Sequence, residues 1–312
     1  MGTSSRKSEN PGSKEYLEWK GTKIPYIQCE NNMPNMAALR VLLQMVRKLK
    51  PKFCVLIGGN SILGNLVDAM IPVLTVGLAP SDFESTMTSC QTLSRKLEEN
   101  DLKLLKQIGK DEKSVISSVF TSGLQSQSGT VSRNEIGLQE NKFILVIVGN
   151  RLDSDIDEHF MNMLACALDD EMEAAFIGKS FASLEGYLIK IPRLKGKVHY
   201  LGATHNILAW LEVCDLYVNP KRKGGGTSAV EALFKGVPVI TTAYGDVAAN
   251  VGKKFYTESY DTMSELIRKY KKDQDFYKKM SALAKKRSEI LLDTEGEFQR
   301  IIEEFENRTR GK

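Results

Sequence analysis

The sequence is poor in residues that bind metals or form disulfides. Its 312 residues include only three histidines and five cysteines. No histidine lies in an HExxH pattern, and the cysteines are widely spaced without a CxxC pair, so neither a zinc site nor a disulfide framework is indicated. We therefore expect no bound metal and no cofactor, and cysteines that remain free thiols.

Long apolar runs and a strong charge imbalance are also absent. No run approaches the roughly 20 apolar residues that span a bilayer, and the N-terminus lacks the order of a signal peptide. The 43 Lys and Arg residues exceed the 39 Asp and Glu residues by too few to indicate a nucleic-acid binder. These absences predict a cytoplasmic protein. Residues 1–15 are polar, and we expect a disordered tail or a remnant of cloning there.

Short β-rich runs alternate with amphipathic stretches from Tyr16 onward, which is the pattern of parallel sheets crossed by helices. In the first part of the chain, strands are predicted at 24–29, 53–60 and 71–78. Residues 81–112 have a polar, helical pattern, and the Ser-, Thr- and Gly-rich segment 117–135 predicts a loop or linker. We therefore expect a first domain over 16–139.

A second alternating series begins after this linker. Strands are predicted at 142–152, around Phe176, Val198 and Leu216, and at 236–242. Five strands with helical segments between them make a complete doubly wound sheet. The pattern predicts an α/β protein whose second domain covers 140–312 and ends in helices.

The segment from Asn219 to Thr241 carries the most chemical information. It reads NPKRKGGGTSAVEALFKGVPVIT: three glycines follow a strand, and Thr227 and Ser228 open a helix. In a doubly wound sheet, ligands bind at the carboxyl ends of strands, and a helix N-terminus presents unpaired amides and the positive end of its dipole. Glycines allow a phosphate to approach this backbone closely. Three basic residues would offset the charge of a diphosphate: Lys221, Arg222 and Lys223.

This segment resembles the donor-binding signature of GT-B glycosyltransferases, in particular bacterial enzymes of the group 1 type that use nucleotide sugars. The resemblance extends upstream over three further runs, VIVGNRL at 146–152, FIGKS at 176–180 and VHYLGAT at 198–204. It implies two Rossmann-like doubly wound domains facing a cleft, the N-terminal one short or incomplete. It also implies transfer of a sugar from a nucleotide diphosphate sugar, UDP-sugar in first place, to a glycan, lipid-linked or protein acceptor without a metal.

The resemblance assigns roles to individual residues, with Arg151 and Glu231 as the catalytic pair. Glu231 matches the glutamate that holds the ribose hydroxyls, although Ser228 and Glu231 also have the spacing of a helix capping box. Arg151 matches a basic residue that reaches the diphosphate and assists the leaving group, with a solvated surface arginine as the alternative. The residues matching the diphosphate turn are Gly225, Gly226, Thr227 and Ser228. The residues expected at the base are Gly202, Ala203 and Thr204, and a weaker phosphate candidate is Lys179.

The sequence departs from the family pattern in two places. Many retaining members carry a further glutamate eight positions before the one at 231, where this chain has Lys223. No histidine occurs between Tyr16 and Pro80 to contact an acceptor. The alternative function is therefore a non-catalytic nucleotide-sugar-binding subunit that serves a catalytic partner. The thin N-terminal half predicts either a compact variant or a piece of a longer protein.

A basic run between Arg268 and Arg287 contains nine Lys and Arg residues against two Asp. Such a run is typical of the solvated face of helices. The other interpretation is contact with an anionic membrane surface that bears a lipid-linked acceptor, which would place the protein at the inner face of the membrane.

Overall fold

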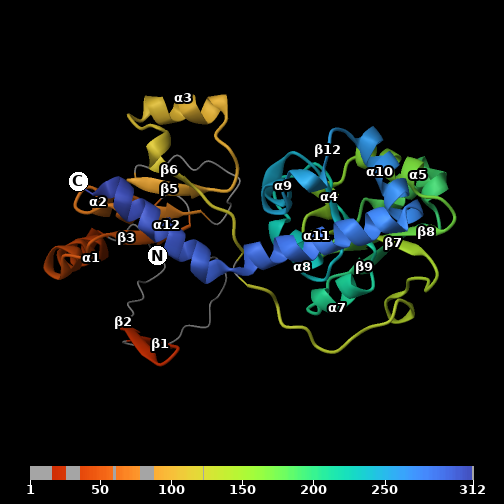
Figure 1. Ribbon diagram of the computed structural model, residues 1–312, viewed down its shortest axis with the longest axis horizontal. Coiled ribbons are helices and arrows are strands. Elements are labelled where there is room, and N and C mark those ends of the chain that lie inside the picture. The colour runs from red at the N-terminus through yellow and green to blue at the C-terminus, as the bar shows by residue number, and fades with distance from the viewer. Residues whose placement is uncertain (1–15, 26–35, 59–60, 78–87, 122, 311–312) are drawn as a thin grey trace. The chain divides into compact units, whose positions relative to one another are not determined.

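The computed structural model describes residues 16–25, 36–58, 61–77, 88–121 and 123–310. The chain divides into two compact units, Met1–Ser117 with Ile301–Lys312 and Ser118–Arg300 (Figure 1). The expected tail at 1–15 lies outside the described residues. These boundaries differ from the expected domains 16–139 and 140–312. The expected linker belongs to the second unit, and the end of the chain belongs to the first.

A four-stranded parallel sheet forms the centre of the first unit, in the order β3-β4-β5-β6. Its strands are β3 (Cys54–Ile57), β4 (Val73–Val76), β5 (Cys90–Leu93) and β6 (Val115–Ser117). The helices described in this unit are α1 (Met36–Leu49), α2 (Ile62–Asp68) and α3 (Glu99–Gln107), and α12 (Thr294–Thr309) ends in it. An apolar cluster around Leu56, Val67 and Val73 joins α1 and α2 to the sheet.

The first predicted strand, at 24–29, is described only in part, and residues 26–29 lie outside the described residues. Its described part, Ile24 and Pro25, lies in β2 (Thr22–Pro25), which pairs antiparallel with β1 (Tyr16–Trp19) in a separate two-stranded sheet. The prediction was wrong here because an apolar run shows that a strand forms but does not show which strand pairs with it.

The helical interpretation of residues 81–112 was wrong for β5, although α3 does lie in this range. The sequence of β5, Cys-Gln-Thr-Leu, is short and half polar, yet all four residues are buried. The carboxylate of Asp68 helps to place this strand: its Oδ1 accepts from the amides of Val73 (2.9 Å) and Ser89 (2.6 Å), which lie where β4 and β5 begin. Such tertiary contacts leave no periodic signal in the sequence.

A six-stranded parallel sheet forms the centre of the second unit, in the order β12-β11-β10-β7-β8-β9. Its strands are β7 (Phe143–Val148), β8 (Met172–Ile177), β9 (Val198–Gly202), β10 (Leu216–Val218), β11 (Val239–Thr242) and β12 (Tyr256–Thr257). The five predicted strands are all present. The sixth, β12, has only two residues, too few for a pattern.

Helices cover this sheet and bury its apolar strands in one large core. They are α4 (Leu152–Asp155), α5 (Glu158–Ala167), α6 (Leu184–Lys190), α7 (Ile207–Glu212), α8 (Gly226–Phe234), α9 (Gly245–Val251), α10 (Tyr260–Lys272) and α11 (Gln274–Leu292). Short 3-10 helices occur at Glu112–Ser114, Asn134–Ile136, Pro192–Leu194 and Lys253–Phe255. None of the helices in the described part of the chain has the length and apolar content of a membrane span.

Arg133 attaches the expected linker to the second unit. Its guanidinium donates to the backbone oxygens of Val213 (2.8 Å), Glu140 (2.9 Å) and Lys142 (2.6 Å). It also forms an ion pair with Asp215, whose Oδ2 lies 2.9 Å from Nη2 and accepts from the amide of Ile144. The segment is therefore attached at the amino ends of β7 and β10, although its composition resembles that of a free linker.

We expect Arg133→Ala to lower the free energy of unfolding of the second unit by about 2 kcal/mol. The substitution removes three hydrogen bonds to carbonyls and leaves the carboxylate of Asp215 without its cation. Urea unfolding, followed at the second unit, measures the change. The exposed Lys195→Ala serves as the control, and equal stabilities of the two variants would contradict the role given to Arg133.

Candidate functional site

The strand order of the second unit reverses between β7 and β10. From β7 the chain adds β8 and β9 on one side, and then β10, β11 and β12 on the other. In doubly wound sheets, ligands bind outside the carboxyl ends of the strands at such a switch point. The chain leaves these two strands through residues 149–151, which contain Arg151, and through residues 219–226, which end in three glycines at 224–226 that we call the glycine turn. The topology thus brings together two segments that lie far apart in the sequence.

Glycines line the carboxyl edge of the sheet beside this point. Gly149 and Gly178 directly follow β7 and β8, and Gly202 ends β9. Their backbones are linked, because the amide of Gly149 donates to the oxygen of Ile177 and that of Gly178 to the oxygen of Gly202. A Cβ atom on Gly178 would lie 1.9 Å from the backbone oxygen of Gly149, so no side chain fits there. Gly178 is therefore required by the close packing of the strand ends, whereas a Cβ atom on Gly202 would meet nothing within 4 Å and the backbone there is open.

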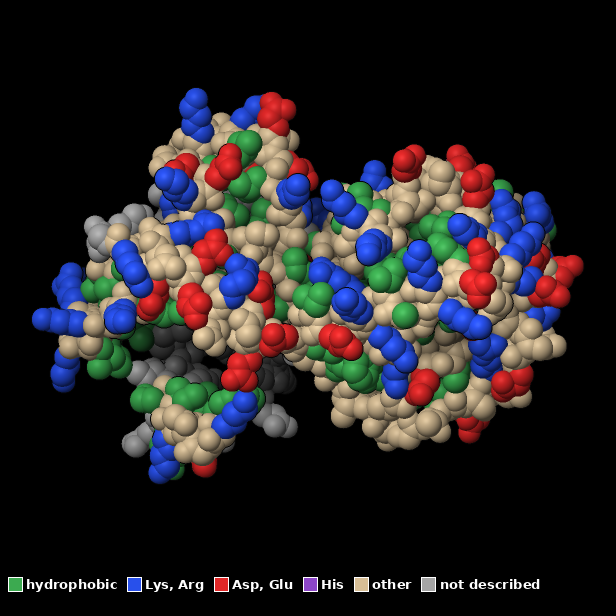
Figure 2. Space-filling view, viewed as in Figure 1, with side chains coloured by type: hydrophobic (Ala, Val, Ile, Leu, Met, Phe, Trp, Pro, Cys, Tyr) green, Lys and Arg blue, Asp and Glu red, His purple; other side chains and the backbone are tan. Residues whose placement is uncertain are grey.

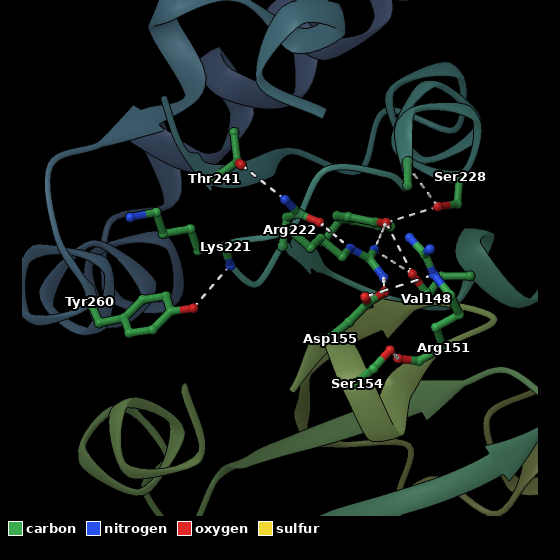
Figure 3. A network of polar contacts seen from close by, with 12 residues as sticks. Val148, Arg151, Ser154, Asp155, Lys221, Arg222, Ser228, Thr241 and Tyr260 are labelled. Atoms are coloured by element: carbon green, nitrogen blue, oxygen red, sulfur yellow. Dashed lines mark hydrogen bonds and ion pairs between the residues drawn. The ribbon is translucent and has the colours of Figure 1, made fainter. Parts of the chain in front are cut away.

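Arg222 is a structural residue, in contrast to the expected role in offsetting the diphosphate charge. Its buried guanidinium donates to Asn219 Oδ1 (2.9 Å), the Val148 oxygen (2.5 Å) and the Tyr217 hydroxyl (3.2 Å) (Figure 3). Its Nη1 also lies 3.3 Å from Asp155 Oδ2. These contacts hold the ends of β7 and β10 and the helix α4 together. Arg222 therefore fixes the shape of the switch point from within.

Arg151 lies beside the glycine turn. It directly precedes α4, its side chain is 67% exposed, and its Nη2 lies 3.5 Å from the position that a Cβ atom on Gly224 would occupy. Its Nε is 3.9 Å from Asp155 Oδ1. Asp155 thus contacts both arginines, one through each carboxylate oxygen. Sequence reasoning missed this role of Asp155, for which the spacing of four residues from Arg151 is the available signal.

The helix α8 begins at Gly226, as the glycine turn predicts. Gly225 adopts a left-handed φ of 99°, and a Cβ atom there would lie 2.6 Å from Arg222 Nη2. The hydroxyl of Ser228 donates to the Gly225 oxygen (3.0 Å) and lies 2.8 Å from the hydroxyl of Tyr217, a contact in which either hydroxyl can be the donor. The amides of residues 226–228 and the hydroxyl of Thr227 make no hydrogen bond to any residue that the structure describes.

The capping-box interpretation of Ser228 and Glu231 was wrong. The residue that precedes α8 is Gly225, and Ser228 lies inside the first turn, three positions too late to cap the helix. Glu231 therefore lacks that structural role.

Glu231 is a buried carboxyl on α8, 3% exposed. Burial raises its pKa from 4.5 to about 7. Within the described residues, its carboxylate forms neither a hydrogen bond nor an ion pair. A buried acid with no partner opposes folding, and such groups are concentrated where a ligand supplies the missing contacts.

Comparison with known proteins identifies the family. A family model described as "Glycosyl transferases group 1" matches residues 130–287, just over half of the chain. The chain belongs to this family. The matched range covers the whole six-stranded sheet, Arg151, the glycine turn and Glu231. The resemblance inferred from the sequence is confirmed, and the protein is a glycosyltransferase.

Solved structures share the fold of this glycosyltransferase. Alr3699/HepE of Anabaena, solved in complex with UDP, is 14% identical with a TM-score of 0.62, over 87% of this chain and 82% of that one. A glycosyltransferase of Rickettsia africae is 11% identical (TM-score 0.61, 93% and 86%), and WaaG is 14% identical (TM-score 0.56, 93% and 86%). These glycosyltransferases confirm the expected GT-B fold class. No curated protein matches the chain.

The remaining predicted site residues of the glycosyltransferase lie along the same sheet edge. Gly202 ends β9, Ala203 is exposed, and Thr204 Oγ1 accepts from the amide of Asn206 (3.0 Å) where α7 begins. Lys179 follows β8 and is exposed. In the described part of the chain, no hydrogen bond or ion pair joins these four residues to Arg151 or α8. Their roles stay predictions.

No cluster of three or more His, Cys, Asp or Glu residues with the geometry of a metal site occurs among the residues described for this glycosyltransferase. Asp153, which follows β7, has its carboxylate engaged by Ser183 and Ser180, and these hydrogen bonds lower its pKa to about 2. Its oxygens are therefore used within the protein.

Proposed function

We propose that the protein transfers a sugar from a UDP-sugar to a glycan, lipid-linked or protein acceptor, and that it needs neither a metal nor a cofactor. One observation carries the proposal: the guanidinium of Arg151 lies against the turn that precedes the free amides of α8, at the switch point of the sheet. HepE, which has the same fold, was solved with UDP and with UDP-glucose. That likeness favours uridine as the base.

The chemistry follows from where negative charge develops. When the bond between the anomeric carbon and the diphosphate oxygen breaks, the departing diphosphate gains charge on its terminal phosphate. The amides of residues 226–228, the hydroxyl of Thr227 and the guanidinium of Arg151 are hydrogen-bond donors held in place before the reaction. Donors held in this way stabilise the transition state more than the ground state. They would take over the charge neutralisation that a metal supplies in other transferases.

The other end of the donor would extend along the glycine edge. Glu231 would accept hydrogen bonds from the ribose hydroxyls, which would provide the partners that its buried carboxylate lacks. Backbone groups of Gly202, Ala203 and Thr204 would contact the base, and Lys179 is the weaker phosphate candidate. A cytoplasmic location accords with the free thiols of the described cysteines.

The test is a comparison of uridine, guanosine and adenosine diphosphates by thermal unfolding in the absence of divalent cations. A ligand at 100 times its Kd stabilises the folded state by about 2.7 kcal/mol. We expect UDP to reach this stabilisation at a lower concentration than the other two. Equal responses to all three nucleotides, or a response that requires a divalent cation, would contradict the corresponding part of the proposal.

The second candidate is a non-catalytic subunit that binds the nucleotide sugar for a partner. It is favoured by Lys223, which occupies the position of the glutamate that contacts the transferred sugar in many retaining members. Incubation of the purified chain with UDP-sugars separates the two functions. Release of UDP that depends on Arg151 indicates the transferase, whereas thermal stabilisation without release indicates the binding subunit.

A further inference from the structure

The region around α1 has no acidic residue. Between Glu30 and Asp68 the sequence contains no Asp or Glu but five basic residues, which are Arg40, Arg47, Lys48, Lys50 and Lys52. Lys52 lies 4.0 Å from Glu306 on α12. The other four have no acidic partner among the residues that the structure describes. This helix therefore carries a positive charge that the described residues of the first unit do not neutralise.

The helix α1 also exposes apolar side chains beside these charges. Its inner side packs through Leu39, Leu43 and Val46. Residues four positions apart share a face of a helix, and Val41, Met45 and Leu49 form a second stripe of this kind. Val41 is 55% and Leu49 70% exposed. At the left-hand edge of Figure 2, where α1 lies in Figure 1, Lys and Arg side chains surround hydrophobic ones.

The basic run at 268–287 differs from α1 because three of its nine basic side chains have partners within the second unit. Lys271 pairs with Asp169 and Glu171, Arg268 donates to the oxygen of Cys166, and Arg287 donates to the oxygen of Asn250. The run also contains the acidic residues Asp273 and Asp275, and Glu289 follows it closely. Unlike α1, the run also exposes no large apolar side chain in the described part of the chain, so α1 has the stronger character of an interfacial helix.

We propose that α1 binds the surface of an anionic lipid membrane. Val41, Met45 and Leu49 would enter the boundary between head groups and acyl chains. Arg40, Arg47 and Lys48 would lie at the level of the lipid phosphates. A short helix with one exposed apolar stripe and only basic charges has the properties of an interfacial helix, which lies in the membrane plane without crossing it. The proposal does not depend on the chemistry of the donor site.

The experiment measures binding of the full chain to vesicles of phosphatidylcholine with phosphatidylglycerol, and to vesicles of phosphatidylcholine alone, by co-sedimentation. We expect binding to the anionic vesicles only, and weaker binding at high salt. Each basic residue near an anionic surface contributes a factor of about five to the affinity, so Arg40→Glu, Arg47→Glu and Lys48→Glu together should weaken binding at least 100-fold.

The matched control carries the same charge change on α11, as Lys278→Glu, Lys279→Glu and Lys286→Glu, and should bind as the unchanged chain does. A second variant, Val41→Ser with Leu49→Ser, alters only exposed side chains and should weaken binding at least tenfold without a change in thermal stability. Absence of binding to anionic vesicles overturns the proposal, as does equal loss in the α11 control. Concentration-dependent dimers that Val41→Ser with Leu49→Ser abolishes would instead assign this face to a second copy of the chain.

Discussion

Replacing Arg151 by alanine should lower kcat for sugar transfer about 100- to 1000-fold, while the free energy of unfolding changes by less than about 0.5 kcal/mol. Loss of one preorganised donor to a developing negative charge typically has an effect of this size on the rate. Stability should hardly change because the side chain is 67% exposed and its contact with Asp155 is long, at 3.9 Å. Rates of UDP release from a UDP-sugar, measured at saturating donor, provide the test.

Two further substitutions make this result specific. Arg151→Lys keeps the charge but loses the planar fork that can bind two phosphate oxygens, so an intermediate rate is expected. Arg193→Ala removes an exposed arginine from a 3-10 helix of the same unit and should leave the rate unchanged. If Arg151→Ala transfers sugar at the wild-type rate, Arg151 is a solvated surface arginine without a role in catalysis.

The sequence predicts this fold best where a strand is buried on both faces. The runs that became β7 and β10 are continuous and apolar, and the polar residues in β8 and β11 are only Glu173, Thr241 and Thr242. The glycine turn before α8 is equally clear, because three consecutive glycines have few structural uses. By contrast, β5 is held by buried polar residues and by the carboxylate of Asp68, and neither has a periodic signature.

Individual side-chain roles were harder to predict than the backbone. The sequence alone does not distinguish the three consecutive basic residues at 221–223. Of these, only Arg222 turns inward, because Asn219, Tyr217 and the end of β7 provide acceptors for its guanidinium. Those acceptors converge only after the sheet has formed with β7 beside β10. The double contact of Asp155 depends on the same event. Sequence reasoning could therefore place the candidate site at the switch point but could not separate the arginine that supports it from the one that we propose to face the ligand.

Glu231→Gln should make the unliganded protein more stable above pH 7 and yet weaken nucleotide binding. The pKa of Glu231 is about 7 in the folded state, above its ordinary value of 4.5, so the folded state retains a proton that the unfolded state has released between these pH values. Stability therefore falls as pH rises through this window. The difference corresponds to about 3 kcal/mol at most. Glutamine is neutral throughout, so the variant should match the wild type below pH 4.5 and exceed it by about 2–3 kcal/mol above pH 7.

The affinity for UDP should increase as the pH rises, whereas the stability of the unliganded protein should decrease. If the ribose hydroxyls donate to the ionised carboxylate, binding below pH 7 must first remove its proton, so the affinity for UDP should fall up to tenfold per pH unit below about 7 and be constant above. Glu231→Gln should abolish this dependence and weaken binding about 10- to 100-fold at pH 8, because hydrogen bonds to a charged group are lost. Calorimetric titration of both proteins across this range provides the measurement, with the exposed Glu265→Gln on α10 as the control. Increased stability with unchanged affinity would assign Glu231 to the core alone, whereas decreased stability above pH 7 would mean that the carboxylate has a partner in the protein.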